Sequence, residues 1–304
     1  MGPTAAGKTD AAVSLVEHFP CDIISVDSAL VYRGMDIGTA KPDADTLARA
    51  PHRLIDIRDP PETYSAGSFR QDALELIQDT HQSGRIPLLV GGTMLYFNIL
   101  EKGIASLPQG DPEIRARLEQ EAAVSGWLVL HQRLEQVDPA AAMQIHPNDP
   151  QRIQRALEVF MLTGKPISQW QKEQQQQAVF PYATLKIALS PAQREVLHER
   201  IARRFHAMVA EGLVAELESL RQRWPLHRDL PAMRSVGYRQ VWDYLEGCYD
   251  QKTLIERGII ATRQLAKRQL TWLRSMEGVH WLDSTQSELW PQLKELIEKA
   301  RVLA

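Results

Sequence analysis

The sequence predicts an α/β fold in which a mostly parallel sheet is flanked by helices and interrupted by an all-helical insertion domain. In both terminal parts of the chain, short apolar runs alternate with helical patterns, as in parallel strands joined by right-handed crossovers. Between these parts, residues 111–177 contain helical patterns with proline-marked starts. The chain also opens, at residues 2–9, on a loop pattern that is typical of P-loop-type sheets.

The first helices and strands follow this loop directly. Residues 8–19 are predicted to form an amphipathic helix, because their apolar side chains recur on one face. Residues 22–26 then form a short apolar run bounded by a turn, which is typical of a buried parallel strand. Two further strands are expected at residues 53–57 and 86–90, with a helix over about residues 68–81 between them.

A different pattern begins at Asp111. The pairs Asp111-Pro112, Asp138-Pro139 and Asp149-Pro150 each place a capping side chain before a proline that suits the first helical turn. No strand pattern lies between them, and the run Gln174–Gln177 is expected to be the exit, as a helix end or a hinge. We therefore predict a core domain of residues 1–110 and 183–304, and a helical insertion domain of residues 111–182.

The α/β pattern returns after the insertion. Residues 184–189 form another apolar run, and Ser190 begins a capping-box sequence for a helix that extends past Met208. The remaining predicted elements are helices over residues 238–246 and 253–276, a strand at residues 279–282 and a closing helix from about residue 287.

Composition excludes several classes of protein. A hydrophobic content of 44% with 24% charged residues, over 304 residues, is ordinary for a folded globular protein. No apolar run is long enough to span a membrane, and Cys21 and Cys248 have neither metal-binding nor redox spacing. No H-x-x-x-H pair indicates a zinc site. We expect a cytoplasmic protein that has no membrane partner.

The opening loop, Gly-Pro-Thr-Ala-Ala-Gly-Lys-Thr, matches G-x-x-x-x-G-K-[ST] in full. Its glycines let several backbone N–H groups point at one anion, at the positive end of the following helix. Lys8 would reach a terminal phosphate, and the Thr9 hydroxyl would hold Mg²⁺. The residues predicted to bind a phosphorylated ligand are Gly2, Pro3, Thr4, Ala5, Ala6, Gly7, Lys8 and Thr9.

A loop of this kind normally hangs from the end of a buried strand, but only Met1 precedes Gly2. Either the natural protein continues before this residue, or the fold tolerates the loss of a central strand. We expect the first, because a missing strand would leave an unpaired gap in the sheet.

Asp27 ends the strand that follows the loop helix. An acid at this position can be a Mg²⁺ partner, a general base or a turn cap. The strand at residues 86–90 ends in Gly91-Gly92-Thr93, and Asp56 lies inside its strand, so no apolar run ends in the acid that a nucleotide hydrolase needs. Ordinary triphosphate hydrolysis is therefore disfavoured.

Basic residues cluster locally in a chain of net charge −3. Between residues 256 and 274, five basic side chains accompany the single acid Glu256, with Trp272 among them. Such a surface suits a phosphate backbone with stacked bases, although a charged helix face can also simply be solvated. Segments 151–155 and 234–239 add further arginines, which indicates a cleft that grips one large polyanion.

The chain as a whole resembles the bacterial tRNA dimethylallyltransferases, also called tRNA isopentenyltransferases. The motifs that carry the resemblance are Gly2–Thr9, Asp27–Leu30, Gly34–Pro42, Gly91–Thr93, Gln151–Arg155, Arg234–Arg239 and Lys267–Arg274. The resemblance implies transfer of a dimethylallyl group from dimethylallyl diphosphate to the exocyclic amine of the adenosine 3′-adjacent to the tRNA anticodon. It also implies that the loop binds an allylic diphosphate rather than ATP.

The same resemblance assigns roles to single residues. Lys8, Mg²⁺ on Thr9 and Arg204 would stabilise the departing diphosphate, Asp27 would accept the amine proton, and Thr93 would lie between the substrates. A monomer that binds the anticodon stem-loop is expected. The residues implied in tRNA binding are Asp27, Ser28, Ala29, Leu30, Thr93, Arg115, Gln151, Arg152, Ile153, Gln154, Arg155, Arg234, Ser235, Val236, Gly237, Tyr238, Arg239, Lys267, Arg268, Gln269, Leu270, Thr271, Trp272, Leu273 and Arg274.

Two other functions remain open at this stage. A nucleotide or nucleoside kinase also combines a phosphate loop with a helical lid, and an RNA-binding module could retain the loop without catalysis. Transfer of a labelled γ-phosphate would distinguish the kinase, and turnover of the intact diphosphate would distinguish the module.

Overall fold

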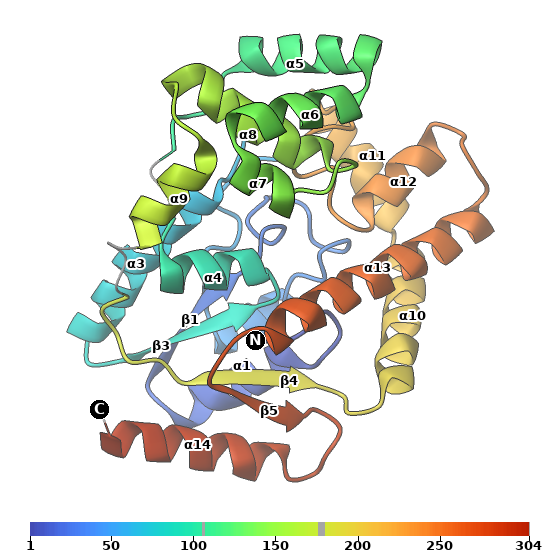
Figure 1. Ribbon diagram of the computed structural model, residues 1–304. Coiled ribbons are helices and arrows are strands. Elements are labelled where there is room, and N and C mark those ends of the chain that lie inside the picture. Colours follow the sequence, from blue (N-terminus) through green and yellow to red (C-terminus); the bar gives the residue numbers. More distant parts are fainter. Residues whose placement is uncertain (105–106, 176–179, 304) are drawn as a thin grey trace. The chain divides into compact units, whose positions relative to one another are not determined.

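The computed structural model describes residues 1–104, 107–175 and 180–303 (Figure 1). The chain divides into two compact units: Met1–Phe97 with Tyr182–Ala304, and Asn98–Pro181. We call them the α/β unit and the helical unit. The helical unit therefore begins at Asn98, before the predicted boundary at residue 111, and ends at Pro181.

The α/β unit contains two small sheets, and every strand pair in them is parallel. One sheet has the order β2 (His52–Arg53), β1 (Cys21–Val26), β3 (Ile86–Gly91), and the other pairs β4 (Lys186–Ser190) with β5 (Val279–Asp283). The Met1 carbonyl accepts a hydrogen bond from the Leu189 N–H of β4, at 2.9 Å. The prediction of a mixed α/β fold with parallel strands is confirmed.

Alternation along β1 explains how helices pack on the first sheet. Ile23 forms a buried cluster with Ala12 and Val13 of α1 (Lys8–His18). Successive strand residues point to opposite faces, so Ile24, which is also fully buried, lies on the other face. Helix α3 (Ala66–Gln82) also contacts both β1 and β3. The two remaining early helices are α2 (Ala44–Arg49) and α4 (Met94–Lys102).

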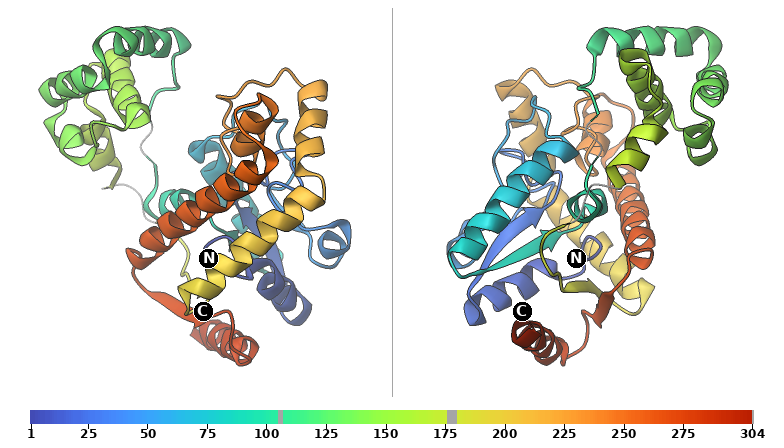
Figure 2. Two further views of the ribbon diagram at one scale, coloured as in Figure 1. Left: turned by 90° about the vertical axis from the view of Figure 1, so that its right-hand side faces the viewer. Right: turned by 60° about the vertical axis from the view of Figure 1, so that its left-hand side comes forward.

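The C-terminal helices build the second half of this unit. Helix α13 (Gln251–Arg274) packs against α10 (Arg194–Ala210), and the two lie side by side in both views of Figure 2. A Cβ atom at Gly258 of α13 would lie 1.9 Å from the Phe205 ring of α10, so a side chain there would separate the helices. The other helices are α11 (Leu213–Arg223), α12 (Tyr238–Leu245) and α14 (Leu289–Leu303).

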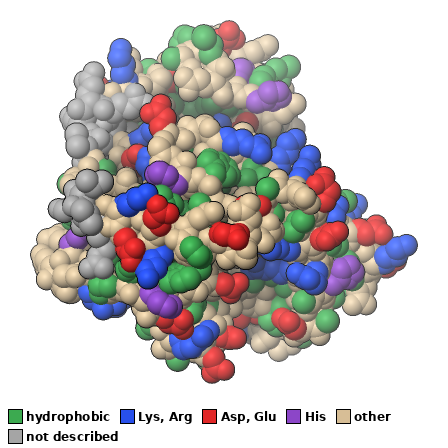
Figure 3. Space-filling view, turned by 90° about the horizontal axis from the view of Figure 1, so that it is seen from below, with side chains coloured by type: hydrophobic (Ala, Val, Ile, Leu, Met, Phe, Trp, Pro, Cys, Tyr) green, Lys and Arg blue, Asp and Glu red, His purple; other side chains and the backbone are tan. Residues whose placement is uncertain are grey.

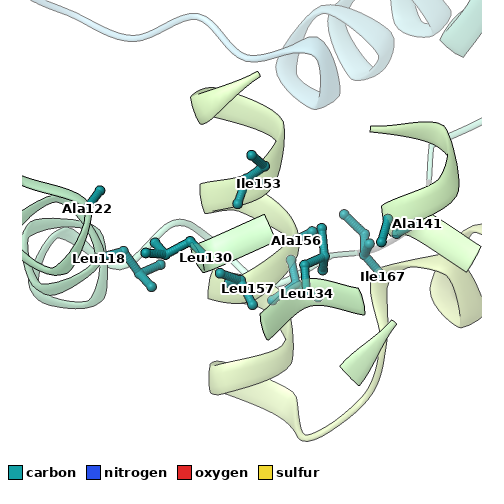
Figure 4. Close-up of a cluster of buried hydrophobic side chains, with 11 residues drawn as sticks. Leu118, Ala122, Leu130, Leu134, Ala141, Ile153, Ala156, Leu157 and Ile167 are labelled. Carbon is teal, nitrogen blue, oxygen red and sulfur yellow. The ribbon is translucent and has the colours of Figure 1, made fainter. Parts of the chain in front are cut away.

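The described residues of the helical unit form helices and no strand. Its helices are α5 (Pro112–Ser125), α6 (Trp127–Val137), α7 (Pro139–Gln144), α8 (Pro150–Thr163) and α9 (Ile167–Gln175). The three predicted Asp-Pro starts are confirmed, because Asp111, Asp138 and Asp149 each accept a hydrogen bond from an N–H of the first turn. Leu118, Leu130, Leu134 and Leu157 meet in the buried core of the unit (Figure 4).

The predicted strand at residues 53–57 is wrong. Strand β2 ends at Arg53, because Leu54 and Asp56 have left-handed backbones with φ of 64° and 54°. Asp56 turns to pair with the Lys41 ammonium, at 2.5 Å, and that lysine side chain is only 5% exposed. Satisfying this buried charge takes precedence over extending the strand.

The predicted capping box at Ser190 is also wrong. Ser190 is the last residue of β4, and α10 begins at Arg194 after Gln193, which makes no side-chain cap. Asp283 of the neighbouring strand β5 accepts the Ala192 N–H instead, at 3.2 Å. Of the predicted exit Gln174–Gln177, residues 176 and 177 lie outside the described residues.

In the described parts of the chain, no helix combines the length and the apolar content that crossing a membrane requires.

Candidate functional site

A cavity of about 1310 Å³ opens in the α/β unit where the ends of β1 and β3 meet the Gly2–Thr9 loop, α10 and α13. Parallel strands bring their carboxyl ends to one sheet edge, where loops can surround a ligand. Most of the predicted site residues of this unit line the cavity. They are Thr4, Ala5, Ala6, Gly7, Lys8, Thr9, Asp27, Ser28, Ala29, Leu30, Thr93, Arg204, Arg234, Ser235, Val236, Gly237, Arg268, Gln269 and Trp272.

The Gly2–Thr9 loop leaves the first N–H groups of α1 without a side-chain cap. Its N-cap residue is Gly7, in a left-handed conformation with φ of 86°, and Ala5 is also left-handed, with φ of 61°. The N–H groups that open a helix have no partner within the helix, and they carry the positive end of its dipole. This loop therefore offers donors to an anion in the cavity.

Three glycines allow close packing around the loop. A Cβ atom at Gly2 would lie 2.4 Å from the Leu189 carbonyl oxygen, and one at Gly91 would lie 2.0 Å from that of Val26. At Gly92, a Cβ atom would lie 2.4 Å from the side-chain nitrogen of Gln269. The cavity wall thus depends on the absence of side chains at these positions.

Two cations in the cavity, Lys8 and Arg204, form no ion pair with any described residue. The pKa of Lys8 is lowered to about 8, mainly by burial; the charge of Asp27 opposes the shift, and that of Arg204 adds to it. The Lys8 ammonium donates to the Pro3 carbonyl at 2.7 Å, which satisfies a proton but neutralises no charge. Burial also lowers the pKa of Arg204, again opposed by Asp27. Among the described residues, no hydrogen bond or ion pair holds the Arg204 guanidinium.

Asp27 and Thr93 connect the ends of β1 and β3. One Asp27 oxygen, Oδ1, accepts the N–H groups of Ala29 at 2.9 Å and Leu30 at 3.4 Å. This is the turn-capping role; Asp27 also lines the cavity, and among the described residues no hydrogen bond engages its Oδ2. The Thr93 hydroxyl oxygen accepts the Ser28 N–H at 3.0 Å, which links the two strand ends beside Asp27.

The donor set indicates how a metal could be held. Over the described residues, no group of three or more His, Cys, Asp and Glu side chains forms a metal site. Thr9 lies in the cavity next to Lys8. A hard cation there would be held by the Thr9 hydroxyl together with phosphate oxygens and water, which is a coordination that suits Mg²⁺.

Comparison with known proteins identifies the family to which the chain is similar. The family model described as IPP transferase matches residues 30–276. A tRNA dimethylallyltransferase of Alkalilimnicola ehrlichii is 62% identical over 288 residues, covering 94% of this chain and 90% of that protein.

This chain belongs to the IPP transferase family.

Solved structures agree with the assignment of this chain to the IPP transferase family. A tRNA isopentenylpyrophosphate transferase of Bacillus halodurans has a TM-score of 0.71 and 38% identity, covering 99% of this chain and 96% of the other. A Staphylococcus epidermidis tRNA isopentenylpyrophosphate transferase has a TM-score of 0.71 and 32% identity, covering 100% and 98%. A eukaryotic dimethylallyltransferase described as acting on tRNA has a TM-score of 0.80 and 27% identity, covering 97% and 76%.

Other predicted residues of the α/β unit lie away from the cavity lining. Arg239, Lys267, Thr271 and Arg274 are exposed, so their side chains are available to a partner. One face of the molecule shows groups of Lys and Arg side chains among acidic ones, which is how local basic surfaces coexist with a net charge of −3 (Figure 3). Gly2, Pro3, Tyr238, Leu270 and Leu273 are buried or half-buried and do not line the cavity.

Three residues predicted to bind tRNA have side chains that are buried in this structure. Ile153, Tyr238 and Leu273 are fully buried, because each occupies the inward face of its helix. Ile153 lies among the core side chains of the helical unit in Figure 4. Tyr238 donates its hydroxyl to Glu216, a residue of α11.

The helical unit holds its own group of predicted residues. Arg115 and Arg155 both bind Glu158, with nitrogen–oxygen distances of 2.7 Å and 2.5 Å, and the Glu158 side chain is 0% exposed. Arg152 pairs with Asp149 at 3.3 Å and remains 64% exposed. Gln151 is exposed, and Gln154 donates to Glu119 at 3.0 Å.

Some cavity residues are absent from the sequence prediction. Arg200 and Arg203 line the cavity from the same helix as Arg204, and the spacing Arg-x-x-Arg-Arg is the signal that could have found them. Gly38, Thr39 and Ala40 also line it. Their place depends on Glu216, whose carboxylate accepts the N–H groups of residues 36–38 at 2.7–3.1 Å. That long-range contact leaves no local pattern in the sequence.

Proposed function

We propose that this chain moves a dimethylallyl group from dimethylallyl diphosphate to the exocyclic amine of the adenosine 3′-adjacent to the tRNA anticodon and releases diphosphate. One observation carries the proposal: Lys8 and Arg204 lie in the cavity beside an uncapped helix start and Asp27, and no described residue forms an ion pair with either of them. Charges desolvated in this way are stabilised by a multiply charged anion.

The Gly2–Thr9 loop acts as a phosphate-binding loop for the diphosphate. Its N–H groups and Lys8 hold the phosphate oxygens, and Arg204 stabilises the charge that grows as the allylic carbon–oxygen bond breaks. Thr9 would hold Mg²⁺, which supplies further positive charge to the leaving group when it is bound. The Gly91–Thr93 turn places the Thr93 hydroxyl at the same sheet edge.

Asp27 accepts the proton of the attacking amine. A new carbon–nitrogen bond forms as the carbon–oxygen bond breaks, and the adenine amine loses a proton to stay neutral. Asp27 Oδ1 is already occupied by two backbone N–H groups, which fix the orientation of the carboxylate, so Oδ2 is the oxygen that takes the proton.

The tRNA is held by basic side chains in both units. The adenosine must leave the anticodon-loop stack to reach a cavity, and phosphate and stacking contacts offset that cost. In the α/β unit, Arg234, Arg239, Lys267, Arg268 and Arg274 are exposed, and Trp272 is a stacking surface. In the helical unit, which we propose to be an insertion domain that grips tRNA, Arg152 is an exposed arginine whose side chain is 64% accessible. We further propose a cytoplasmic monomer.

The test of the reaction is incubation of the protein with unmodified tRNA, Mg²⁺ and dimethylallyl diphosphate, followed by nucleoside analysis. Prenylated adenosine and free diphosphate are the expected products. Transfer of a γ-phosphate from ATP in place of prenylation would contradict the proposal.

The Asp27→Asn variant tests the proton acceptor. It keeps the shape of the side chain but removes proton acceptance, so the rate should fall by about 10²–10⁴-fold with both substrates still bound. If excess Mg²⁺ restores the rate, Asp27 is a metal partner instead.

A further inference from the structure

Gln269 lies in the motif that the family resemblance assigns to tRNA binding, yet its side-chain amide is engaged inside the protein. Its carbonyl oxygen, Oε1, accepts the Thr4 N–H of the Gly2–Thr9 loop at 2.9 Å. Its amide nitrogen, Nε2, donates to the Gly92 carbonyl at 2.8 Å. The two partners fix which end of the amide points where, since an N–H requires an acceptor and a carbonyl requires a donor.

This pair of bonds joins three segments that are distant in the sequence. Thr4 is 265 residues from Gln269, and Gly92 is 177 residues away. Gln269 lies near the C-terminal end of α13, and Figure 1 shows that end of the helix beside the start of the chain. Gly92 leaves no room for a Cβ atom, because one would lie 2.4 Å from Gln269 Nε2 and 3.3 Å from the Gly2 carbonyl oxygen. The amide therefore fills the space between the loop and the Gly91–Thr93 turn.

The connection continues to the proposed proton acceptor. Thr93 follows Gly92 directly, and its hydroxyl oxygen accepts the Ser28 N–H at 3.0 Å. Ser28 in turn follows Asp27, whose carboxylate caps the same turn. Displacing the Gln269 amide would thus release the loop on one side and the Thr93–Ser28 link on the other.

We propose that Gln269 is a positioning residue that holds the Gly2–Thr9 loop and the Gly91–Thr93 turn in register, and that it is not a tRNA contact. This inference rests on the proposed function, because it takes the loop as the diphosphate site. Neighbouring Arg268 and Trp272 of α13 line the cavity with exposed side chains, so one helix presents RNA-facing groups and also fixes the diphosphate site.

The test uses Gln269→Met, which keeps the length of the side chain and removes both hydrogen bonds. Gln264→Met is the matched control, because Gln264 is an exposed glutamine of the same helix. Pyrophosphate binding is measured by calorimetry with Mg²⁺ and without tRNA, and tRNA binding is measured separately. Thermal unfolding of each variant confirms that it is folded.

Gln269→Met should weaken pyrophosphate binding by about 10–30-fold, as expected for two lost hydrogen bonds, and leave tRNA affinity unchanged. With both substrates saturating, kcat should also fall, by about tenfold. The reason is that Thr93 and Asp27 would no longer be held in the correct position relative to the bound diphosphate. Gln264→Met should match the wild type in all three measurements.

Two results for the variant would overturn the inference. Pyrophosphate binding equal to that of the wild type would remove the positioning role, and lost tRNA affinity with intact pyrophosphate binding would make Gln269 an RNA contact. Wild-type protein that fails to bind pyrophosphate would instead contradict the proposed function, and the inference would fail with it.

Discussion

Two groups of cations, one in each unit, differ in what surrounds them. In the helical unit, Arg115 and Arg155 converge on Glu158, whose carboxylate is fully buried and also accepts the Asp111 N–H at 2.8 Å. In the part of the α/β unit that the structure describes, the Lys8 ammonium donates only to a neutral carbonyl, and Arg204 has neither a hydrogen-bond nor an ion-pair partner.

The pKa shifts follow this difference. Burial raises the pKa of Glu158, but the hydrogen bonds from Arg115, Arg155 and the Asp111 N–H outweigh burial, so its pKa lies below the ordinary value. Burial lowers the pKa of Lys8 and Arg204, and the charge of Asp27 opposes both shifts without reversing them. Satisfied charges stabilise the fold, whereas unsatisfied cations in a cavity cost folding free energy and are therefore the better candidates for ligand binding.

The largest effect is expected at Arg204. Arg204→Ala should lower kcat/KM by about 10²–10³-fold, because it removes one donor to the growing charge of the diphosphate. The free energy of unfolding should be unchanged or higher, since a desolvated cation is removed. Steady-state kinetics and urea unfolding measure the two quantities. A large loss of stability with nearly normal kcat/KM would show that Arg204 stabilises the fold, as Arg115 and Arg155 do, and has no part in the reaction.

The opposite outcome is expected at Glu158. Glu158→Gln should lower the free energy of unfolding by about 2–3 kcal/mol, less than for a fully buried pair because the two arginines remain partly exposed. Pyrophosphate affinity should not change. Because the folded pKa is lowered, the stabilisation by Glu158 is present above about pH 4.3 and is lost as the pH falls through the folded pKa. In acid unfolding, the Glu158→Gln variant should therefore not show the loss of stability that protonation of Glu158 causes.

A smaller effect is expected from the titration of Lys8. Its pKa is lowered to about 8 in the free protein, and a bound anion favours the charged form and so raises the pKa. Protons are then taken up on binding above about pH 8, so pyrophosphate affinity should fall there, by up to about tenfold per pH unit. Lys8→Arg keeps its charge and should lack this part of the decline. Calorimetry that finds the same pH dependence in both proteins would rule out Lys8 as its source.

The smallest effects are expected at two arginines of α8, which should respond differently to substitution. Arg152 is 64% exposed, whereas Arg155 is 29% exposed and bound to Glu158. Arg152→Ala should flatten the log–log salt dependence of tRNA binding by about one unit and leave stability unchanged. Arg155→Ala should lower stability and leave the salt slope alone. If Arg155→Ala alone flattens the slope, this arginine exchanges Glu158 for a phosphate when tRNA binds.

Local patterns predicted those parts of the fold whose cause is local. The Asp-Pro helix starts were predictable because a capping side chain and a proline act within one turn. The strand at residues 22–26 was predictable because its apolar run is buried on both faces. The prediction for residues 53–57 was wrong because Asp56 turns to share the Lys41 ammonium with Asp36, and the pattern of residues 53–57 carries no sign of that contact.

The residues of the candidate site also divide into those that a local pattern predicts and those that it does not. The Gly2–Thr9 loop is one contiguous motif, so its cavity-lining residues Thr4–Thr9 were predictable together, and Asp27 was predictable from its place at a strand end. The exposure of tRNA-motif residues was not predictable, because Ile153 and Arg152 are sequence neighbours that point to opposite sides of α8. The motif alone assigned both to tRNA.

By itself the sequence determined the type of chemistry, because the phosphate-binding pattern, the acid at the strand end and the basic segments are properties of residue type and short spacing. Only the tertiary structure decided which charges are satisfied. Glu158 neutralises Arg115 and Arg155, Gln269 joins Thr4 to Gly92, and Arg204 has no partner among the described residues. These outcomes depend on contacts between distant residues, since the free energy of a buried charge or amide is set by the groups that surround it in space.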